Sequence, residues 1–135
     1  MKGFEEVEHT ADWAFRTRGV DLKQLFVNAA SAMFELQVRP PLPLAEEVER
    51  QVEVTGFDRE TLLVNWLNEL LYLQEKYGEI YREFELQEIS DTRLRARLRG
   101  QRSPGVARVI KAVTFHGLEI KRLAEGWEAT VVVDV

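Results

Sequence analysis

The chain has 135 residues, of which 45% are hydrophobic and 30% charged, as expected for a globular protein with one apolar core. Its formal net charge of −5 argues against a general nucleic-acid binder, since such proteins usually carry an excess of basic residues. The absence of cysteine excludes disulfides and thiolate metal sites, and no apolar run approaches the ~18 residues of a membrane span. The first residues lack the apolar segment of a signal peptide. We therefore expect one cytoplasmic domain over residues 1–135.

The first half of the chain predicts two strands that alternate with two amphipathic helices. Over residues 13–18, Trp, Phe and Thr alternate with Ala, Arg and Arg, and this period of two is typical of a half-buried strand. Asp21 is a good helix N-cap and the apolar residues after it recur at helical spacing, so we predict a helix over 22–36. Three prolines then end regular structure. Residues 48–54 alternate again, and a second, more buried helix is predicted between positions 58 and 78.

The second half of the chain predicts consecutive strands. Residues 80–87 and 93–99 alternate on either side of a turn at Ser90-Asp91, which indicates a hairpin. Further strands are predicted at 107–115, 118–123 and 127–133. Consecutive strands favour an α+β fold over alternating βαβ units. We expect a mainly antiparallel sheet with the two amphipathic helices packed on one face, and we see no internal repeat.

The most prominent charge feature is a row of alternating arginines on one predicted strand, formed by Arg93, Arg95, Arg97 and Arg99. The row could bind phosphate, as in an RNA-binding module. It could also be a solvated sheet face whose arginines pair with Glu83 and Glu85 on the neighbouring strand. The acidic net charge favours the second interpretation, although two glutamates do not supply a partner for every arginine.

Carboxylates occur close to both chain ends. Asp12 closes the stretch His9-Thr10-Ala11-Asp12, and Asp134 precedes the terminal carboxylate of Val135. If the fold brings the ends together, these groups form an all-oxygen cluster of up to three negative charges. Such a cluster is repulsive unless a hard cation such as calcium or magnesium is bound in it. A single Asp after a polar stretch is also a common turn residue, so the spacing alone does not decide.

A third polar stretch runs from Lys111 to His116. By strand alternation Lys111 shares a face with Val113 and Phe115, which is unusual for a lysine unless it reaches water from the strand end. His9 and His116 are the only histidines, and without HExxH spacing they are weak support for zinc. Our central hypothesis is that the fold brings this stretch together with the two chain ends.

The sequence resembles the archease family from end to end. The segments that carry the resemblance are Phe4-Glu5, His9-Thr10-Ala11-Asp12, Leu25-Phe26, Leu62-Leu63, Trp66-Leu67, Gly100, Lys111-Ala112-Val113-Thr114-Phe115-His116, Gly126-Trp127 and Asp134-Val135. Two departures are evident. Phe115 stands where the family usually has tyrosine, and the loop before Lys111 is short and lacks a histidine often found there.

The resemblance implies a protein partner of RtcB-type tRNA-splicing RNA ligases rather than an enzyme. Such proteins help the ligase accept guanylate from GTP and complete repeated rounds of RNA joining. The resemblance also implies a site for calcium or another divalent cation, with Asp12, Asp134 and Val135 as ligands. We assign Lys111, His9 and His116 to activation or contact with the ligase, and expect neither strong direct nucleic-acid binding nor membrane association.

Two alternatives from other classes remain open at this point. The first is a metal-dependent phosphoester hydrolase that uses Asp12, Asp134, Lys111 and His116, although no clear nucleophile or general base accompanies the carboxylates. The second is an RNA-binding module that uses the face from Arg93 to Arg99.

Overall fold

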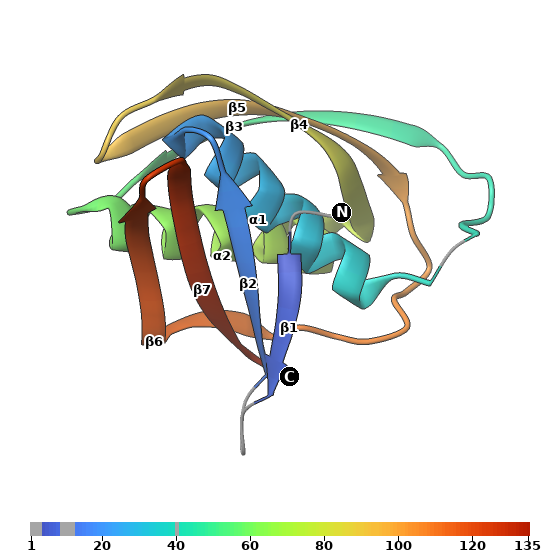
Figure 1. Cartoon of the computed structure of the whole chain (residues 1–135). Helices are drawn as coiled ribbons and strands as arrows, with labels where there is room; N and C mark the ends of the chain where they lie inside the picture. Colours follow the sequence, from blue (N-terminus) through green and yellow to red (C-terminus); the bar gives the residue numbers. More distant parts are fainter. Residues whose placement is uncertain (1–3, 9–12, 40) are drawn as a thin grey trace.

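The computed structural model describes residues 4–8, 13–39 and 41–135 (Figure 1). In chain order the elements are β1 (Phe4–Glu8), β2 (Trp13–Gly19), α1 (Leu22–Gln37), β3 (Glu47–Thr55), α2 (Arg59–Tyr77), β4 (Glu79–Ile89), β5 (Arg93–Arg102), β6 (Ala112–Leu123) and β7 (Gly126–Asp134). The predicted α+β class is confirmed.

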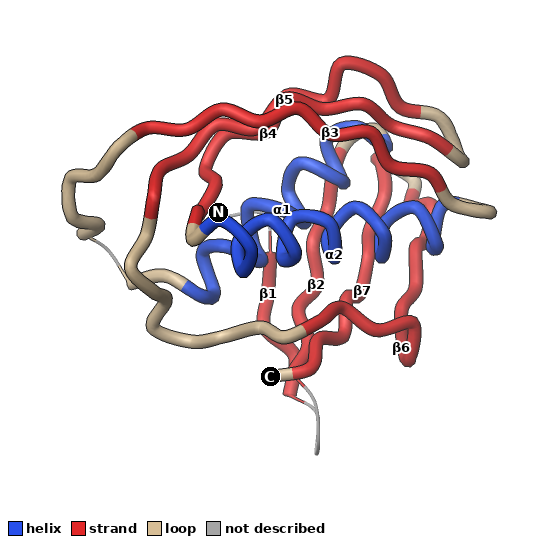
Figure 2. Tube along the Cα trace, turned by 180° about the vertical axis from the view of Figure 1, so that it is seen from behind, coloured by secondary structure: helices blue, strands red, loops and turns tan. Residues whose placement is uncertain are grey.

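The strands form two antiparallel sheets rather than one. One sheet has the order β1-β2-β7-β6 and the other the order β3-β5-β4. The helices lie between the sheets, where α1 contacts β2 and β4 while α2 contacts β6 and β3 (Figures 1 and 2). The expected packing of helices on one sheet face therefore holds for each sheet separately. Periodicity could not predict the division, because it depends on the pairing of β3 with β5, which are distant in sequence.

Both helices begin at an aspartate N-cap, as predicted. A carboxylate oxygen of Asp21 accepts a hydrogen bond from the Gln24 N–H at 2.7 Å, and Asp58 accepts one from the Thr61 N–H at 2.8 Å. The second helix ends at Gly78, whose φ of 65° is the left-handed conformation that glycine adopts without steric cost.

The two strand-to-helix connections are built alike, which the sequence analysis did not detect. Each contains Gly-x-Asp, and the seventh residue after each aspartate is an asparagine. Asn28 donates to the Arg18 carbonyl at 2.6 Å, and Asn65 donates to the Thr55 carbonyl at 2.8 Å. Each asparagine therefore fastens its helix to the end of the preceding strand. The likeness extends to apolar positions, because Leu25, Val27 and Leu36 correspond to Leu62, Val64 and Leu73.

The same correspondence places Gln37 and Gln74 at matching positions in the two helices. Their side-chain amides exchange two hydrogen bonds, at 3.0 Å and 2.9 Å. Gln37 is completely buried, so this pair satisfies polar groups that would otherwise lie unbonded in the interior.

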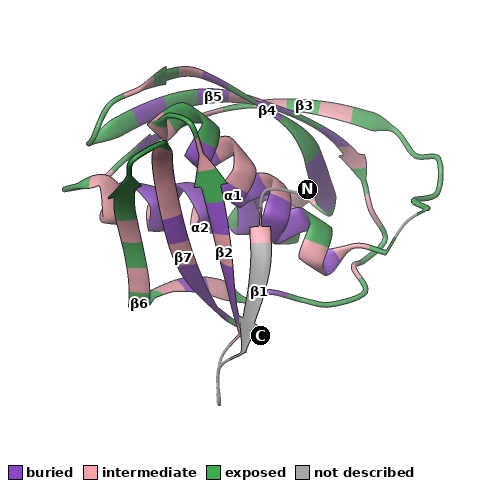
Figure 3. Cartoon of the chain, in the orientation of Figure 1, coloured by how far each residue is buried: buried purple, intermediate pink, exposed green. Residues whose placement is uncertain are grey.

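The apolar core lies between the two sheets. Buried residues make up eight of the 16 residues of α1 and eight of the 19 residues of α2, and they continue onto the sheet faces turned toward the helices (Figure 3). Trp66 of α2 is fully buried, and its indole N–H donates to the Phe26 carbonyl of α1 at 3.0 Å. This bond joins the two helices at the centre of the core and satisfies the one polar group of the indole.

The prediction of separate strands at 107–115 and 118–123 was wrong. A single strand, β6, runs from Ala112 to Leu123, with an irregular register between Thr114 and Glu119 and a φ of 73° at Gly117. Residues 107–111 form no strand. Their backbone is held by α1 instead, because Gln37 accepts hydrogen bonds from two N–H groups of this segment.

Candidate metal and partner site at the chain ends

Three distant parts of the sequence meet at one end of the first sheet. Trp13, at the start of β2, pairs with Val133 near the end of β7, and Val133 also pairs with Val113 near the start of β6. The Lys111 N–H donates to the Asp134 carbonyl at 2.8 Å. The C-terminus therefore lies at the start of β2 and beside Lys111, and Figure 1 shows it at the lower end of β2. The predicted meeting of the lysine stretch with the C-terminus is confirmed.

A cation–π contact further connects the lysine segment to the beginning of β2. The Arg108 guanidinium lies over the Trp13 ring, 4.0 Å from its centroid. Trp13 directly follows Asp12 in the chain. Sequence reasoning missed Arg108, because its contact with Trp13 depends on the course of an irregular loop.

The described residues supply two of the three predicted metal ligands. Asp134 is exposed at the end of β7, and Val135 is 47% exposed and carries the terminal carboxylate. Both donors are the hard oxygen ligands that calcium and magnesium prefer, so this part of the predicted set suits such a cation. Asp12 and His9 lie outside the described residues. Within the described residues, no group of three or more acidic, histidine or cysteine side chains could hold a metal ion.

Lys111 is exposed and immediately precedes β6. The predicted face shared with Val113 and Phe115 does not form, because Val113 is buried whereas Phe115 is 57% exposed. The irregular register that begins after Thr114 explains why the alternation fails.

His116 lies away from the chain ends. It is exposed and falls in the irregular part of β6, beyond Thr114, which pairs with Val132. A strand advances ~3.3 Å per residue, so the five residues from Lys111 to His116 can span up to roughly 16 Å. The structure thus brings Lys111 to the C-terminus and leaves His116 at the other end of the same stretch.

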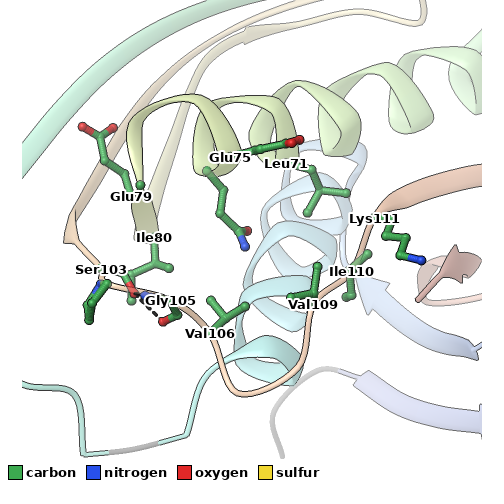
Figure 4. Close-up of a pocket in the computed structure, with 13 residues that line it drawn as sticks. Leu71, Glu75, Glu79, Ile80, Ser103, Gly105, Val106, Val109, Ile110 and Lys111 are labelled. Atoms are coloured by element: carbon green, nitrogen blue, oxygen red, sulfur yellow. Dashed lines mark hydrogen bonds between the residues drawn. The ribbon is translucent and has the colours of Figure 1, made fainter.

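A pocket of about 500 Å³ lies beside Lys111, between the end of α2, the start of β4 and the loop that precedes β6 (Figure 4). Lys111 and Glu79 mark its two ends, and aliphatic side chains line much of the wall between them. These are Leu71, Ile80, Val106, Val109 and Ile110. The loop that leads to Lys111 is consequently not packed against α2 along its whole length.

Asn68 of α2 is a second residue that sequence reasoning missed. Its amide donates to the Val113 carbonyl at 3.0 Å, and its side-chain oxygen accepts from the Val113 N–H at 2.8 Å. A polar residue between Leu67 and Glu69 on the predicted buried helix was the available signal. Nothing in the sequence identifies Val113 as its partner.

The arginine row on β5 is a ladder of ion pairs. Each arginine has a carboxylate within reach: Arg93 pairs with Glu53, Arg95 with Glu88 at 3.1 Å, Arg97 with Glu49 and Glu85 at 3.5 Å and 3.6 Å, and Arg99 with Glu49 and Glu83 at 3.7 Å and 3.9 Å. The predicted partners Glu83 and Glu85 are present. Glutamates of β3 complete the ladder, because β5 lies between β3 and β4. The arrangement gives the phosphate-binding interpretation no support.

The second sheet also contains an ion pair between a buried carboxylate and a partly exposed arginine, which the sequence did not predict. Glu79 is 1% exposed and accepts two hydrogen bonds from Arg50, both at 2.8 Å, and one from the Tyr81 hydroxyl at 2.6 Å. The bonds from Arg50, assisted by that from Tyr81, hold the pKa of Glu79 below its ordinary value despite burial. Burial, together with the bond to Glu79, raises the pKa of Tyr81.

Comparisons with known proteins find similarity over almost the whole chain. Residues 4–135 match the model of the Archease protein family (MTH1598/TM1083). The chain is 39% identical to "Protein archease" of Methanosarcina mazei over 142 aligned positions, covering 99% of this chain and 97% of that protein.

Solved structures show the same architecture. The solution structure of Methanobacterium thermoautotrophicum Protein 1598 matches with a TM-score of 0.79 and 38% identity, covering 100% of both chains. A crystal structure from Thermotoga maritima, described as an archease and possible chaperone, matches with a TM-score of 0.68 and 20% identity, covering 97% of this chain and 96% of that one. None of the helices in the described residues is long and apolar enough to cross a membrane.

Proposed function

Because this chain belongs to the archease protein family, we propose that it activates an RtcB-type tRNA-splicing RNA ligase in the cytoplasm. In this proposal it promotes guanylylation of the ligase and repeated turnover, and catalyses no reaction by itself. The observation that carries the proposal is the meeting of Lys111 with the C-terminus. These residues belong to the stretches on which the resemblance to the family is most specific, and the fold places them side by side.

The proposal includes a site for calcium or another divalent cation, with Asp12, Asp134 and Val135 as ligands. Asp134 and the Val135 carboxylate are adjacent and exposed, so they repel each other in the absence of a cation. A bound cation would offset this repulsion between the two neighbouring carboxylates. Trp13, which follows Asp12, lies in the same row of the sheet as Val133.

We propose Lys111, His9 and His116 as residues of activation or partner contact. Lys111 is exposed, and its backbone N–H donates to the Asp134 carbonyl. His116 lies further along β6, so it would contact a different part of the ligase from Lys111. The net charge of −5 would steer the protein toward a basic RNA-binding enzyme.

The test is a ligase turnover assay with GTP, manganese and RNA, with and without this protein. We expect the wild type to raise the number of RNA joining events per ligase. A variant that lacks Asp134 and Val135 should fold but lose both calcium binding and activation. A C-terminal tag, which keeps Asp134 and removes only the free terminal carboxylate, should have an intermediate effect.

Three outcomes would contradict the proposal. Unchanged ligase turnover together with phosphoester hydrolysis by the isolated protein would establish the hydrolase alternative. Salt-sensitive RNA binding that depends on Arg95 and Arg97 would establish the RNA-binding alternative. Calcium binding and activation by the truncated protein at wild-type levels would show that the chain ends do not form the site.

A further inference from the structure

The position of Lys111 depends on a small number of identifiable hydrogen bonds. The loop before it borders the pocket of about 500 Å³, so close packing against α2 does not fix its course. The sheet holds Lys111 directly through one described bond, from its N–H to the Asp134 carbonyl. Side chains of the two helices hold the backbone on either side of it.

On the side before Lys111, Gln37 holds the loop. Its backbone carbonyl accepts from the Arg108 N–H at 3.1 Å, and its side-chain oxygen accepts from the Ile110 N–H at 3.2 Å. The side-chain amide of Gln37 is itself oriented by its two bonds with Gln74 of α2. The Gln37 side-chain oxygen that accepts from the Ile110 N–H is therefore held in a fixed orientation by Gln74.

On the side after Lys111, Asn68 holds the strand. β6 is an edge strand of its sheet, and edge strands present N–H and C=O groups that no neighbouring strand satisfies. The Asn68 amide bonds both the N–H and the C=O of Val113, as a neighbouring strand would. Val113 is buried, so these groups could not bond to bulk water instead.

We propose that Asn68 is a positioning residue, which fixes the backbone of Val113 and thereby places Lys111 beside the C-terminal carboxylates. The structural part of this proposal stands on the hydrogen bonds alone. The part that concerns ligase activation rests on the proposed function.

The repeated strand-to-helix connections show that this role is specific to Asn68. Asn65, one turn earlier on the same helix, makes one bond to Thr55 at the end of β3, and Asn28 makes the matching bond in the other connection. The position of α1 that corresponds to Asn68 is Ser31. Asn65 is therefore a matched control, which shares the residue type, the helix and the kind of bond, but holds a strand of the other sheet.

The first test is amide hydrogen exchange, measured by NMR on wild type, Asn68→Ala and Asn65→Ala. We expect exchange at Val113 and Lys111 to accelerate by about tenfold in Asn68→Ala and to stay unchanged in Asn65→Ala. Asn68→Asp keeps an acceptor for the Val113 N–H but replaces the donor to the Val113 carbonyl by an oxygen, so protection at Val113 should fall between wild type and Asn68→Ala. It provides a folded comparison if the alanine variant is unstable. Equal protection in all variants would overturn the positioning role, whatever the protein activates.

The second test is a double-mutant cycle in the ligase assay. We expect Asn68→Ala to lower activation by about tenfold in the wild-type background and to have no further effect in the Lys111→Ala background. A purely structural contribution would lower activation by the same factor in both backgrounds and would contradict the proposal. If Lys111→Ala activates like wild type, the assigned role of Lys111 is wrong, and the exchange experiment still decides whether Asn68 positions it.

Discussion

Two carboxylates at strand ends have opposite surroundings. Glu79, at the start of β4, is 1% exposed and accepts three hydrogen bonds from Arg50 and Tyr81. Asp134, at the end of β7, is exposed and stands next to the terminal carboxylate of Val135. A buried charge with a fixed partner of opposite sign holds the fold together. Exposed charges of like sign gathered at one place contribute no such stability, and they remain available to a ligand.

The comparison predicts that disrupting the Glu79 site has the largest effect on stability. Arg50→Ala would leave a buried carboxylate without its cation, a change that typically costs roughly 3–5 kcal/mol. It would also remove the contact of the Arg50 guanidinium with the Tyr77 ring, 3.8 Å from the centroid. Chemical denaturation measures the effect. Arg82→Ala is the control, because Arg82 pairs with Glu47 on the surface and its loss should cost ~1 kcal/mol or less.

The pH dependence of stability provides a second measure of the Glu79 site. The pKa of Glu79 is lowered in the folded protein, so its contribution is fully present above the ordinary value near 4.5 and is lost as the pH falls through the lowered pKa. Glu79→Gln removes this contribution at every pH. The free energy of unfolding of wild type should therefore exceed that of Glu79→Gln most at neutral pH, and the difference should shrink in acid. A difference that is constant with pH would show that the charge of Glu79 does not stabilise the fold.

Much of the fold was predictable because it depends on local signals. The caps at Asp21 and Asp58, the stop at Gly78 and the hairpin of β4 and β5 are encoded in adjacent residues. The division into two sheets and the partners of Glu79 were not predictable, since they depend on pairing between segments distant in sequence. The glutamates of β3 alternate as the arginines of β5 do, and this charge match was the only signal of that pairing.

The candidate site was predictable in part. Resemblance to a known family identified Lys111, Asp134 and Val135, and the structure places them together. Periodicity wrongly assigned residues 107–111 to a strand, because the apolar residues of this loop are spaced like those of a strand. The contact of Arg108 with Trp13 and the bonds of Asn68 to Val113 follow from tertiary packing, which no single segment of the sequence encodes.

The arginine ladder is intermediate between Glu79 and Asp134, since its charges are paired, as at Glu79, but exposed, as at Asp134. Exposed ion pairs contribute ~1 kcal/mol or less each, so Arg95→Ala should reduce the free energy of unfolding only slightly. Arg97→Ala should cost somewhat more, because Arg97 bridges Glu49 and Glu85 and is more buried. Both variants should activate the ligase normally. A large loss of activation by a folded variant would place the ladder in the partner interface.

The smallest effect on stability and a large effect on function are expected at Asp134. Asp134→Asn keeps the backbone carbonyl of residue 134, so the hydrogen bond that joins Lys111 to the end of β7 is retained. It removes one of two adjacent negative charges, so the free energy of unfolding without metal should stay constant or rise. Stabilisation by calcium should decrease, because a ligand that binds only the folded state stabilises it by an amount that increases with its affinity. Glu119→Gln makes the same change of charge on β6, at a residue that pairs with Lys121, and should alter neither calcium binding nor activation. The measurements are thermal unfolding with and without calcium beside the ligase assay.

If Asp134→Asn destabilised the metal-free protein as strongly as Arg50→Ala, the C-terminal carboxylate would be structural like Glu79. The contrast between the two regions would then be wrong.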